Sequence, residues 1–209
     1  MAQTYHQLRL DLAAALALFL DPEEAHAECI RWFEEGLERS RSWMAIHGRE
    51  PVPPEVRRRV SAWVRRRRKG EPWAYILGWT LFRDRRFKVG PATLIPRPET
   101  ELLVEAALDV GRRLKVDRCV DVGTGSGIIA VSLALETAWQ VVASDLSPGA
   151  LAVARENARA LGAAVTFVEG SLLEPVPDPL GLVVANLPYV DPADQPTLQR
   201  ELAFEPATA

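Results

Sequence analysis

The glycine-rich segment DVGTGSG, residues 121–127, constrains the fold of this chain more than any other feature. It follows the apolar stretch Arg118–Val122, which predicts a buried strand, and it leads into Gly127–Glu136, which predicts a helix. Glycines at alternate positions permit a tight turn and a close approach of the backbone to a ligand. The N–H groups at the start of the helix favour an anionic group. The segment therefore predicts a nucleotide-like cofactor at the carboxyl ends of parallel strands.

Predicted helices and strands alternate along the second half of the chain. Helices are expected at 98–114, 127–136 and 148–161, and strands at 118–122, 140–144, 164–168 and 181–185. This alternation is typical of an α/β fold with a doubly wound parallel sheet. We assign it to one domain, residues 93–209.

The preceding residues predict a different architecture. Residues 1–72 show helical patterns only, and DPEE at 21–24 predicts a helix start with Asp21 as the capping residue. The other helices are expected at 4–20, 40–46 and 54–69. Residues 73–92 then predict a hairpin linker, with Arg83 and Asp84 between its two strands. We therefore expect a small N-terminal helical domain joined by a hairpin to the α/β domain.

Charge and cysteine content agree with two domains in a reducing compartment. Residues 1–90 hold 17 basic and 12 acidic side chains, whereas residues 91–209 hold 8 and 16. Cys29 and Cys119 are far apart in sequence, so neither a disulfide framework nor a metal site is predicted. The apolar run 12–20 has acidic flanks and is shorter than the roughly 20 residues that cross a bilayer. We expect a cytoplasmic protein without a membrane partner.

The residues around the glycine-rich turn narrow the cofactor class. Ile128 stands where a dinucleotide fingerprint requires glycine or alanine, and no P-loop lysine follows. Asp145 ends the second strand, where a carboxylate accepts hydrogen bonds from ribose hydroxyls. Leu172, after the third strand, is expected against an adenine ring. The acidic-x-Gly-x-Gly-x-Gly pattern resembles that of Rossmann-like S-adenosylmethionine-dependent methyltransferases; a glycine-rich turn without a ligand is the alternative.

The tetrapeptide NLPY, residues 186–189, ends the fourth predicted strand. It resembles the [N/D]-P-P-[Y/F] motif of methyltransferases that modify planar nitrogen atoms, with Leu187 in place of the usual proline. Such a nitrogen is a poor nucleophile because its lone pair is delocalised. The Asn186 side-chain oxygen and the Pro188 carbonyl can accept its N–H groups, and Tyr189 can stack on the planar group. A simple strand-ending turn is the alternative.

Two further segments carry a more specific resemblance. GEPWAYILG at 70–78 and FKVGPATLIPRPETELLVE at 87–105, ahead of the two motifs above, closely resemble the peptide chain release factor glutamine methyltransferases. The resemblance extends over nearly the whole chain. It implies S-adenosylmethionine-dependent methylation of the side-chain amide of the glutamine in the Gly-Gly-Gln motif of class I release factors, with residues 1–72 recognising the substrate.

The motifs and the resemblance together give a set of expected site residues. We expect the cofactor to contact Asp121, Gly123, Thr124, Gly125, Gly127, Asp145, Leu146, Ser171, Leu172 and Asn186. We expect the substrate to contact Arg97, Asn186, Leu187, Pro188 and Tyr189. The catalytic residues are expected to be Asn186, Pro188 and Tyr189. Ser171 departs from the acidic residue that many members carry.

The same motifs and architecture are compatible with other functions. A ribosomal-protein glutamine methyltransferase shares the architecture, and a nucleic-acid amino-group methyltransferase shares the tetrapeptide. The acidic balance of residues 91–209 argues against direct nucleic-acid binding. A non-catalytic cofactor-binding module is a third alternative. Because the resemblance implies seven strands and only four can be placed, we expect the C-terminal strands to be missing and the chain to be part of a longer one.

The arginine-rich run 57–69 allows three interpretations. Clustered arginines on one helix can neutralise nucleic-acid phosphates. They can also form a solvated helix face, with Val60 and Trp63 turned inward. The family resemblance adds a third interpretation, which is contact with an acidic surface of a release factor.

Overall fold

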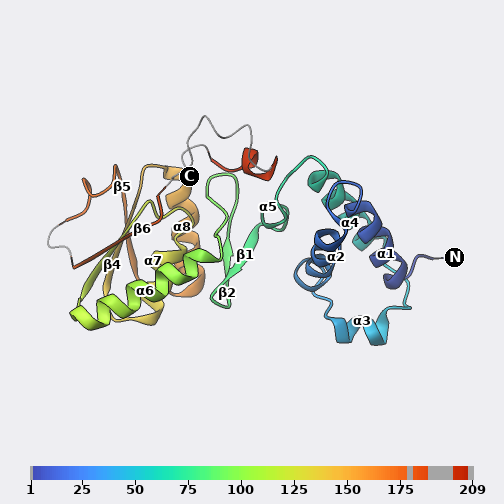
Figure 1. Ribbon diagram of the computed structural model, residues 1–209, viewed down its shortest axis with the longest axis horizontal. Coiled ribbons are helices and arrows are strands. Elements are labelled where there is room, and N and C mark those ends of the chain that lie inside the picture. Colours follow the sequence, from blue (N-terminus) through green and yellow to red (C-terminus); the bar gives the residue numbers. More distant parts are fainter. Residues whose placement is uncertain (1, 178–180, 188–199, 207–209) are drawn as a thin grey trace. The chain divides into compact units, whose positions relative to one another are not determined.

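The computed structural model describes residues 2–177, 181–187 and 200–206 of the chain (Figure 1). The chain forms two compact units, Met1–Ile76 and Leu77–Ala209. No helix in the described ranges is long and apolar enough to cross a membrane. Both cysteines are buried and unbridged.

The first unit is helical. Its elements are α1 (Tyr5–Leu16), α2 (Pro22–Arg31), the π-helical turn η1 (Trp32–Gly36), α3 (Arg41–His47), α4 (Pro54–Arg67) and α5 (Trp73–Leu77). The predicted start of α2 is confirmed, since the Asp21 side chain accepts hydrogen bonds from the N–H groups of Glu23 and Glu24. The turn η1 lies within the second predicted helix, whose apolar residues recur at helical spacing as far as Leu37, but it is a single π-helical turn. Helix α5 has no counterpart among the predicted helices, because it is only five residues long, too short for a clear helical periodicity.

Aromatic rings and one ion pair form the centre of the first unit. Trp32 stacks on Trp73 at 4.6 Å between ring centroids, and Trp63 meets both rings edge-on. Beside them, Glu28 accepts hydrogen bonds from Nε and Nη2 of Arg67 at 2.8 and 3.1 Å. Both charged side chains are nearly inaccessible, so the pair belongs to the core rather than to the surface.

This ion pair corrects the interpretation of the arginine-rich run as a wholly solvated face. Val60 and Trp63 point inward as expected, but Arg67, four residues after Trp63, lies on the same buried face of α4. The carboxylate of Glu28 is what makes this burial possible, because an unpaired buried guanidinium would be costly. The run is therefore partly structural.

The second unit opens with the predicted hairpin, β1 (Trp79–Phe82) and β2 (Arg85–Lys88). Arg83 and Asp84 both have positive φ angles of 48° and 60°, as a two-residue turn between twisted strands requires. The hairpin is held inside this unit by Asn157, whose side chain accepts from Lys88 N at 2.7 Å and donates to Lys88 O at 3.0 Å. It also donates to Ser126 O at 2.8 Å, which links the hairpin to the glycine-rich turn.

A four-stranded parallel sheet with the order β5-β4-β3-β6 forms the rest of the second unit. Its elements are α6 (Glu99–Leu114), β3 (Arg118–Val122), α7 (Ile128–Glu136), β4 (Gln140–Asp145), α8 (Pro148–Leu161), β5 (Val165–Glu169), β6 (Leu182–Ala185) and the 3-10 helix η3 (Arg200–Phe204). The predicted parallel α/β arrangement is confirmed, with element boundaries shifted by a residue or two.

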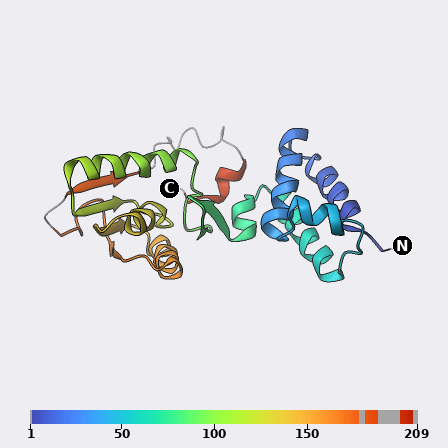
Figure 2. The same cartoon turned by 90° about the horizontal axis from the view of Figure 1, so that it is seen from below.

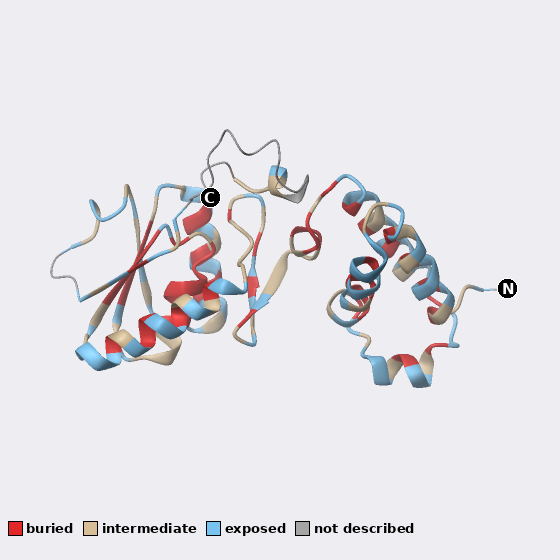
Figure 3. Ribbon diagram, in the orientation of Figure 1, coloured by how far each residue is buried: buried red, intermediate tan, exposed pale blue. Residues whose placement is uncertain are grey.

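The two faces of the sheet are packed differently. Cys119, Ala143 and Val184 belong to the large apolar cluster that includes residues of α6, α7 and α8. Val120, Val122 and Val142 alternate with those residues and form a smaller cluster on the other face. Figure 2 shows the helices alongside the strands, and Figure 3 shows how burial concentrates in the strands and the adjoining helix faces. In the described residues, helices cover one face only, unlike a complete doubly wound sheet.

Candidate functional site

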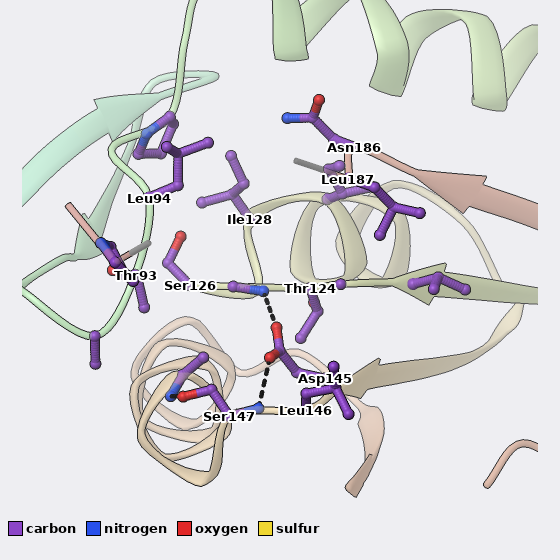
Figure 4. A pocket seen from close by; sticks show the side chains of 18 of the residues that line it. Thr93, Leu94, Thr124, Ser126, Ile128, Asp145, Leu146, Ser147, Asn186 and Leu187 are labelled. Carbon is purple, nitrogen blue, oxygen red and sulfur yellow. Dashed lines mark hydrogen bonds between the residues drawn. The ribbon is translucent and has the colours of Figure 1, made fainter. Parts of the chain in front are cut away.

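A cavity of about 510 Å³ opens at the carboxyl ends of β3, β4 and β6 (Figure 4). Its walls come from the segment after the hairpin, the glycine-rich turn and the ends of the strands. The lining residues include Thr93, Leu94, Pro96, Thr100, Gly123, Thr124, Gly125, Ser126, Ile128, Asp145, Leu146, Ser147, Leu172, Asn186, Leu187 and Pro206. The size and position are those of a ligand site in a parallel α/β sheet.

Asp145 organises the floor of this cavity. Its Oδ2 accepts a hydrogen bond from Gly125 N and its Oδ1 accepts one from Ser147 N, each at 2.8 Å (Figure 4). The carboxylate therefore fixes the glycine-rich turn and the start of α8 relative to each other. Each oxygen of a carboxylate can accept a further bond, so the side chain can also bind hydroxyl groups of a ligand.

The three glycines of the turn, Gly123, Gly125 and Gly127, have different surroundings. All three have positive φ, namely 68° at Gly123, 56° at Gly125 and 80° at Gly127. A Cβ atom on Gly125 would meet no atom within 4 Å and would stand in open space at the cavity. A Cβ atom on Gly127 would instead lie 2.9 Å from Cβ of Ala154 on α8. Gly125 leaves room for a ligand, whereas Gly127 permits close packing and does not line the cavity.

Asp121 supports the turn from below. It is fully buried and does not line the cavity. Its Oδ2 accepts from the Thr124 hydroxyl at 2.6 Å and from Ala130 N at 3.1 Å. Burial raises the pKa of this carboxyl to about 7; the two hydrogen bonds lower the pKa, and the nearby Asp145 raises it. In the described part of the chain its Oδ1 has no hydrogen-bond partner.

The NLPY motif reaches the cavity through its first two residues. Asn186 and Leu187 follow β6 and line the cavity. Leu187 lies against the glycine-rich turn, because a Cβ atom on Gly123 would come within 2.7 Å of its Cδ2. Pro188 and Tyr189, the other two expected catalytic residues, lie outside the described residues.

Besides Asp121 and Gly127, two more expected site residues, Ser171 and Arg97, are not part of the cavity lining. Ser171 lies in the turn after β5, next to Leu172, which does line the cavity. Arg97 is paired with Glu205: its Nη2 is 2.8 and 2.9 Å from the two carboxylate oxygens. In this structure Arg97 thus binds a residue 108 positions away, and it holds the segment that brings Pro206 to the cavity.

Several lining residues were not among the expected ones. Thr93, Leu94, Pro96 and Thr100 come from the segment LIPRPET and the residues just before it. That segment carries the family resemblance, which is a signal for the site, but the residues that the resemblance suggests there, Arg97 and Glu99, are not the ones that line the cavity. Ser126, Ile128 and Ser147 adjoin expected residues and are brought to the cavity by the turns that those residues form.

The charge of the cavity limits the ligand. Asp145 is the single ionisable side chain among the described lining residues, and the remaining groups are apolar, hydroxyl, amide or backbone. A nucleoside triphosphate carries several negative charges, and the described lining residues supply no cation to balance them. A nucleoside with a positively charged substituent and no phosphate fits this lining better.

Comparison with known proteins agrees with both units. The model of the PrmC N-terminal domain matches residues 12–78, and that of a methyltransferase domain matches residues 119–203. The chain is 43% identical over 195 residues to the release factor glutamine methyltransferase of Bordetella pertussis, covering 92% of this chain and 72% of that one. It is 46% identical over 176 residues to that of Neisseria gonorrhoeae, covering 82% and 64%.

The chain is also similar to more distant relatives. It is 39% identical over 190 residues to the release factor glutamine methyltransferase of Bacillus subtilis, and it spans 65% of the length of that relative. Among solved structures, ribosomal protein L11 methylase from Lactobacillus delbrueckii subsp. bulgaricus matches with a TM-score of 0.38 and 33% identity, over 44% of this chain and 47% of that one. The hMettl16 catalytic domain matches with a TM-score of 0.47 and 16% identity, over 58% and 49%.

Proposed function

We propose that this chain, which belongs to the family of release factor glutamine methyltransferases, transfers a methyl group from S-adenosylmethionine to the glutamine amide nitrogen in the Gly-Gly-Gln motif of class I peptide chain release factors. The observation that carries the proposal is the cavity at the strand ends, where Asn186 and the single carboxylate of Asp145 line one site. We place this activity in the cytoplasm, where release factors act.

The lining fits S-adenosylmethionine in three respects. Asp145 has acceptor capacity left for the ribose hydroxyls after its two backbone hydrogen bonds. Leu146 and Leu172 offer apolar surface for the adenine ring. Gly125 leaves space beside the turn because it has no side chain. When bound, this cofactor supplies a methyl group on a positively charged sulfur.

The acceptor side of the cavity acts by positioning. The Asn186 side-chain oxygen accepts one N–H of the substrate amide, and we assign acceptance of the second to the Pro188 carbonyl, with Tyr189 stacking on the amide plane. These contacts direct the nitrogen lone pair toward the methyl carbon. The nitrogen–carbon bond forms as the carbon–sulfur bond breaks, and the nitrogen then loses a proton to water. No general base is required before transfer, because the methylated nitrogen is strongly acidic.

Mass spectrometry of an unmethylated class I release factor, incubated with the protein and S-adenosylmethionine, tests the proposal. We expect one added methyl group on the Gly-Gly-Gln glutamine. Because the chain spans about two thirds of the length of most relatives described above, a version extended to their full length serves as the comparison. If neither version methylates the factor, the proposed substrate is wrong, and ribosomal proteins or nucleic acids carrying amino groups are the substrates to assay next.

Two substitutions at one position test the role of Asn186. Asn186→Ala removes the acceptor and should lower kcat by about 100-fold, as for other donors or acceptors that act on the transition state. Asn186→Asp keeps an acceptor oxygen and should retain more activity. The Kd for S-adenosylmethionine, measured by calorimetry, separates a loss of cofactor binding from a loss of substrate positioning in both variants. A near wild-type rate in Asn186→Ala would show that positioning does not depend on this side chain.

A further inference from the structure

The helical unit carries a second hollow, of about 260 Å³, which the proposed methyl transfer does not use. Its floor includes the buried side chains of Phe33 and Met44. Its rim includes the three arginines Arg9, Arg39 and Arg41, together with Glu34. An apolar floor under a basic rim differs from the cavity at the strand ends, whose one ionisable side chain among the described lining residues is the carboxylate of Asp145.

Irregular backbone shapes this hollow. Leu37 N donates to Trp32 O at 3.0 Å, which closes the π-helical turn η1 and sets the position of Phe33 and Glu34. Glu38 then takes a left-handed conformation with φ of 55°, and Arg39 N donates to Phe33 O at 2.8 Å. A non-glycine residue in this region is strained, and such residues cluster at functional sites. The turn thus holds a rim residue directly beside a floor residue.

The rim holds three arginines but only one carboxylate, that of Glu34, among its described residues. Arg41 Nε lies 3.8 Å from Glu34 Oε1, a long ion pair between exposed groups. The Arg39 guanidinium lies over the ring of Trp43, 4.5 Å from its centroid. Stacking in this way leaves the N–H groups at the edge of the guanidinium available for a carboxylate. Within the described residues, neither Arg9 nor Arg39 has an ion-pair partner.

We propose that this hollow binds an acidic residue next to an apolar residue on the surface of the protein substrate, and this inference rests on the proposed function. The carboxylate would pair with Arg39 and Arg9, and the apolar side chain would enter over Phe33 and Met44. A nucleic-acid backbone fits less well, because the floor is apolar and Glu34 would repel phosphates. The hollow would thus add affinity for an intact protein without taking part in methyl transfer.

Binding of an intact, unmethylated release factor, followed by calorimetry, tests the inference without turnover. Arg39→Ala should raise the Kd for the factor about tenfold, the loss expected for one charged hydrogen bond. Arg39→Lys should recover part of the affinity. Arg49→Ala is the matched control: it removes an exposed arginine between α3 and α4 that does not line the hollow, and it should leave the Kd unchanged.

Methylation kinetics on two substrates separate this site from the catalytic cavity. With the intact factor, Arg39→Ala should raise KM about tenfold at an unchanged kcat. With a short peptide that carries only the Gly-Gly-Gln loop, neither constant should change, because the peptide lacks the acidic and apolar residues that the hollow would bind. Equal effects on both substrates, or none on either, would overturn the inference and leave the proposed function intact.

Three other results would also decide the matter. If Arg49→Ala weakens binding as much as Arg39→Ala, the effect is general charge attraction and the inference is wrong. If a single-stranded RNA oligonucleotide competes with the factor in wild type but not in Arg39→Ala, the occupant is a nucleic acid. If the wild-type chain neither binds nor methylates the factor, both the inference and the proposed function fail.

Discussion

Each unit of the molecule buries a carboxylate in its core, Glu28 in the helical unit and Asp121 in the α/β unit. The two carboxylates differ in whether a cation is their hydrogen-bond partner. In the helical unit, Glu28 accepts two hydrogen bonds from Arg67 and one from Trp32 Nε1 at 3.1 Å. In the α/β unit, Asp121 accepts from a hydroxyl and a backbone N–H, and no cation contacts it in the described residues. The first carboxylate is neutralised by its partner, whereas the second relies on uncharged dipoles.

The presence of a cation beside Glu28 and its absence beside Asp121 in the described residues fit the surroundings of each carboxylate. Glu28 joins α2 to α4 and lines neither of the two cavities described above, so a complete ion pair serves the rigidity of the core. Asp121 lies under a turn whose next residues line the larger cavity, and its hydroxyl and N–H partners orient that turn. Without a cation, burial raises the pKa of Asp121 to about 7. A buried carboxylate beside a site therefore makes the α/β unit sensitive to pH near neutrality.

Removing the cation of the Glu28–Arg67 ion pair should have the largest effect on stability. Arg67→Ala leaves the buried Glu28 without its cation and should lower the free energy of unfolding by about 3–5 kcal/mol. Urea unfolding followed by tryptophan fluorescence reports on this unit, because Trp32, Trp63 and Trp73 surround the pair.

A double substitution checks that reasoning. Glu28→Gln with Arg67→Met removes both charges, keeps an acceptor for Trp32 and should be considerably more stable than Arg67→Ala alone. If Arg67→Ala unfolds at the wild-type urea concentration, the pair contributes nothing to the core.

Titrating Asp121 should have the next largest effect. A carboxyl whose folded pKa is raised from 3.8 to about 7 binds its proton more tightly in the folded state. Its contribution to stability is complete below pH 4 and is lost as the pH rises through 7, by about 1.4 kcal/mol for each pH unit in that window. Asp121→Asn cannot ionise, so its unfolding free energy should change less between pH 5 and pH 8 than that of the wild type. Parallel pH profiles would contradict the raised pKa.

Two glycines with left-handed conformations, Gly125 at the cavity and Gly162 away from it, separate an effect on ligand binding from an effect on backbone strain. A Cβ atom on either Gly125 or Gly162 would meet no atom within 4 Å, and φ is 56° and 71°. Alanine at either position should cost about 1 kcal/mol in backbone strain. Only Gly125→Ala should also weaken S-adenosylmethionine binding, by about tenfold or more, because its methyl group would enter the cavity. The Kd of each variant for S-adenosylmethionine is measured by calorimetry. Equal Kd values for Gly125→Ala and Gly162→Ala would mean that the cofactor does not bind beside Gly125.

The smallest expected effect concerns the ion pair at the cavity wall. Glu205 has 5% of its side chain exposed, and Arg97 has 39%. Arg97→Ala should weaken cofactor binding only several-fold, about 1 kcal/mol, by loosening the segment that brings Pro206 to the cavity. The charge exchange Arg97→Glu with Glu205→Arg should recover part of that affinity in the same calorimetric assay. No recovery would mean that pairing of residues 97 and 205 does not hold this segment at the cavity.

Local signals in the sequence determined most of the secondary structure and the centre of the site. The Asp21 cap, the two-residue turn at Arg83 and Asp84, and the glycine-rich turn each depend on residues a few positions apart. Such features follow from backbone conformation and short-range hydrogen bonds, which the residue types themselves specify. The alternation of helix and strand likewise specified the parallel sheet, and so brought Asp145 and Asn186 to one edge.

Only the tertiary structure decided which partner each charged side chain meets. Arg67 pairs with Glu28 across 39 positions, and Arg97 pairs with Glu205 across 108. Sequence spacing placed Trp63 on the buried face of α4, but it could not show that a carboxylate on another helix allows Arg67 to be buried there as well. The physical reason is that the cost of burying a charge depends on groups contributed by distant segments, and folding alone brings these together.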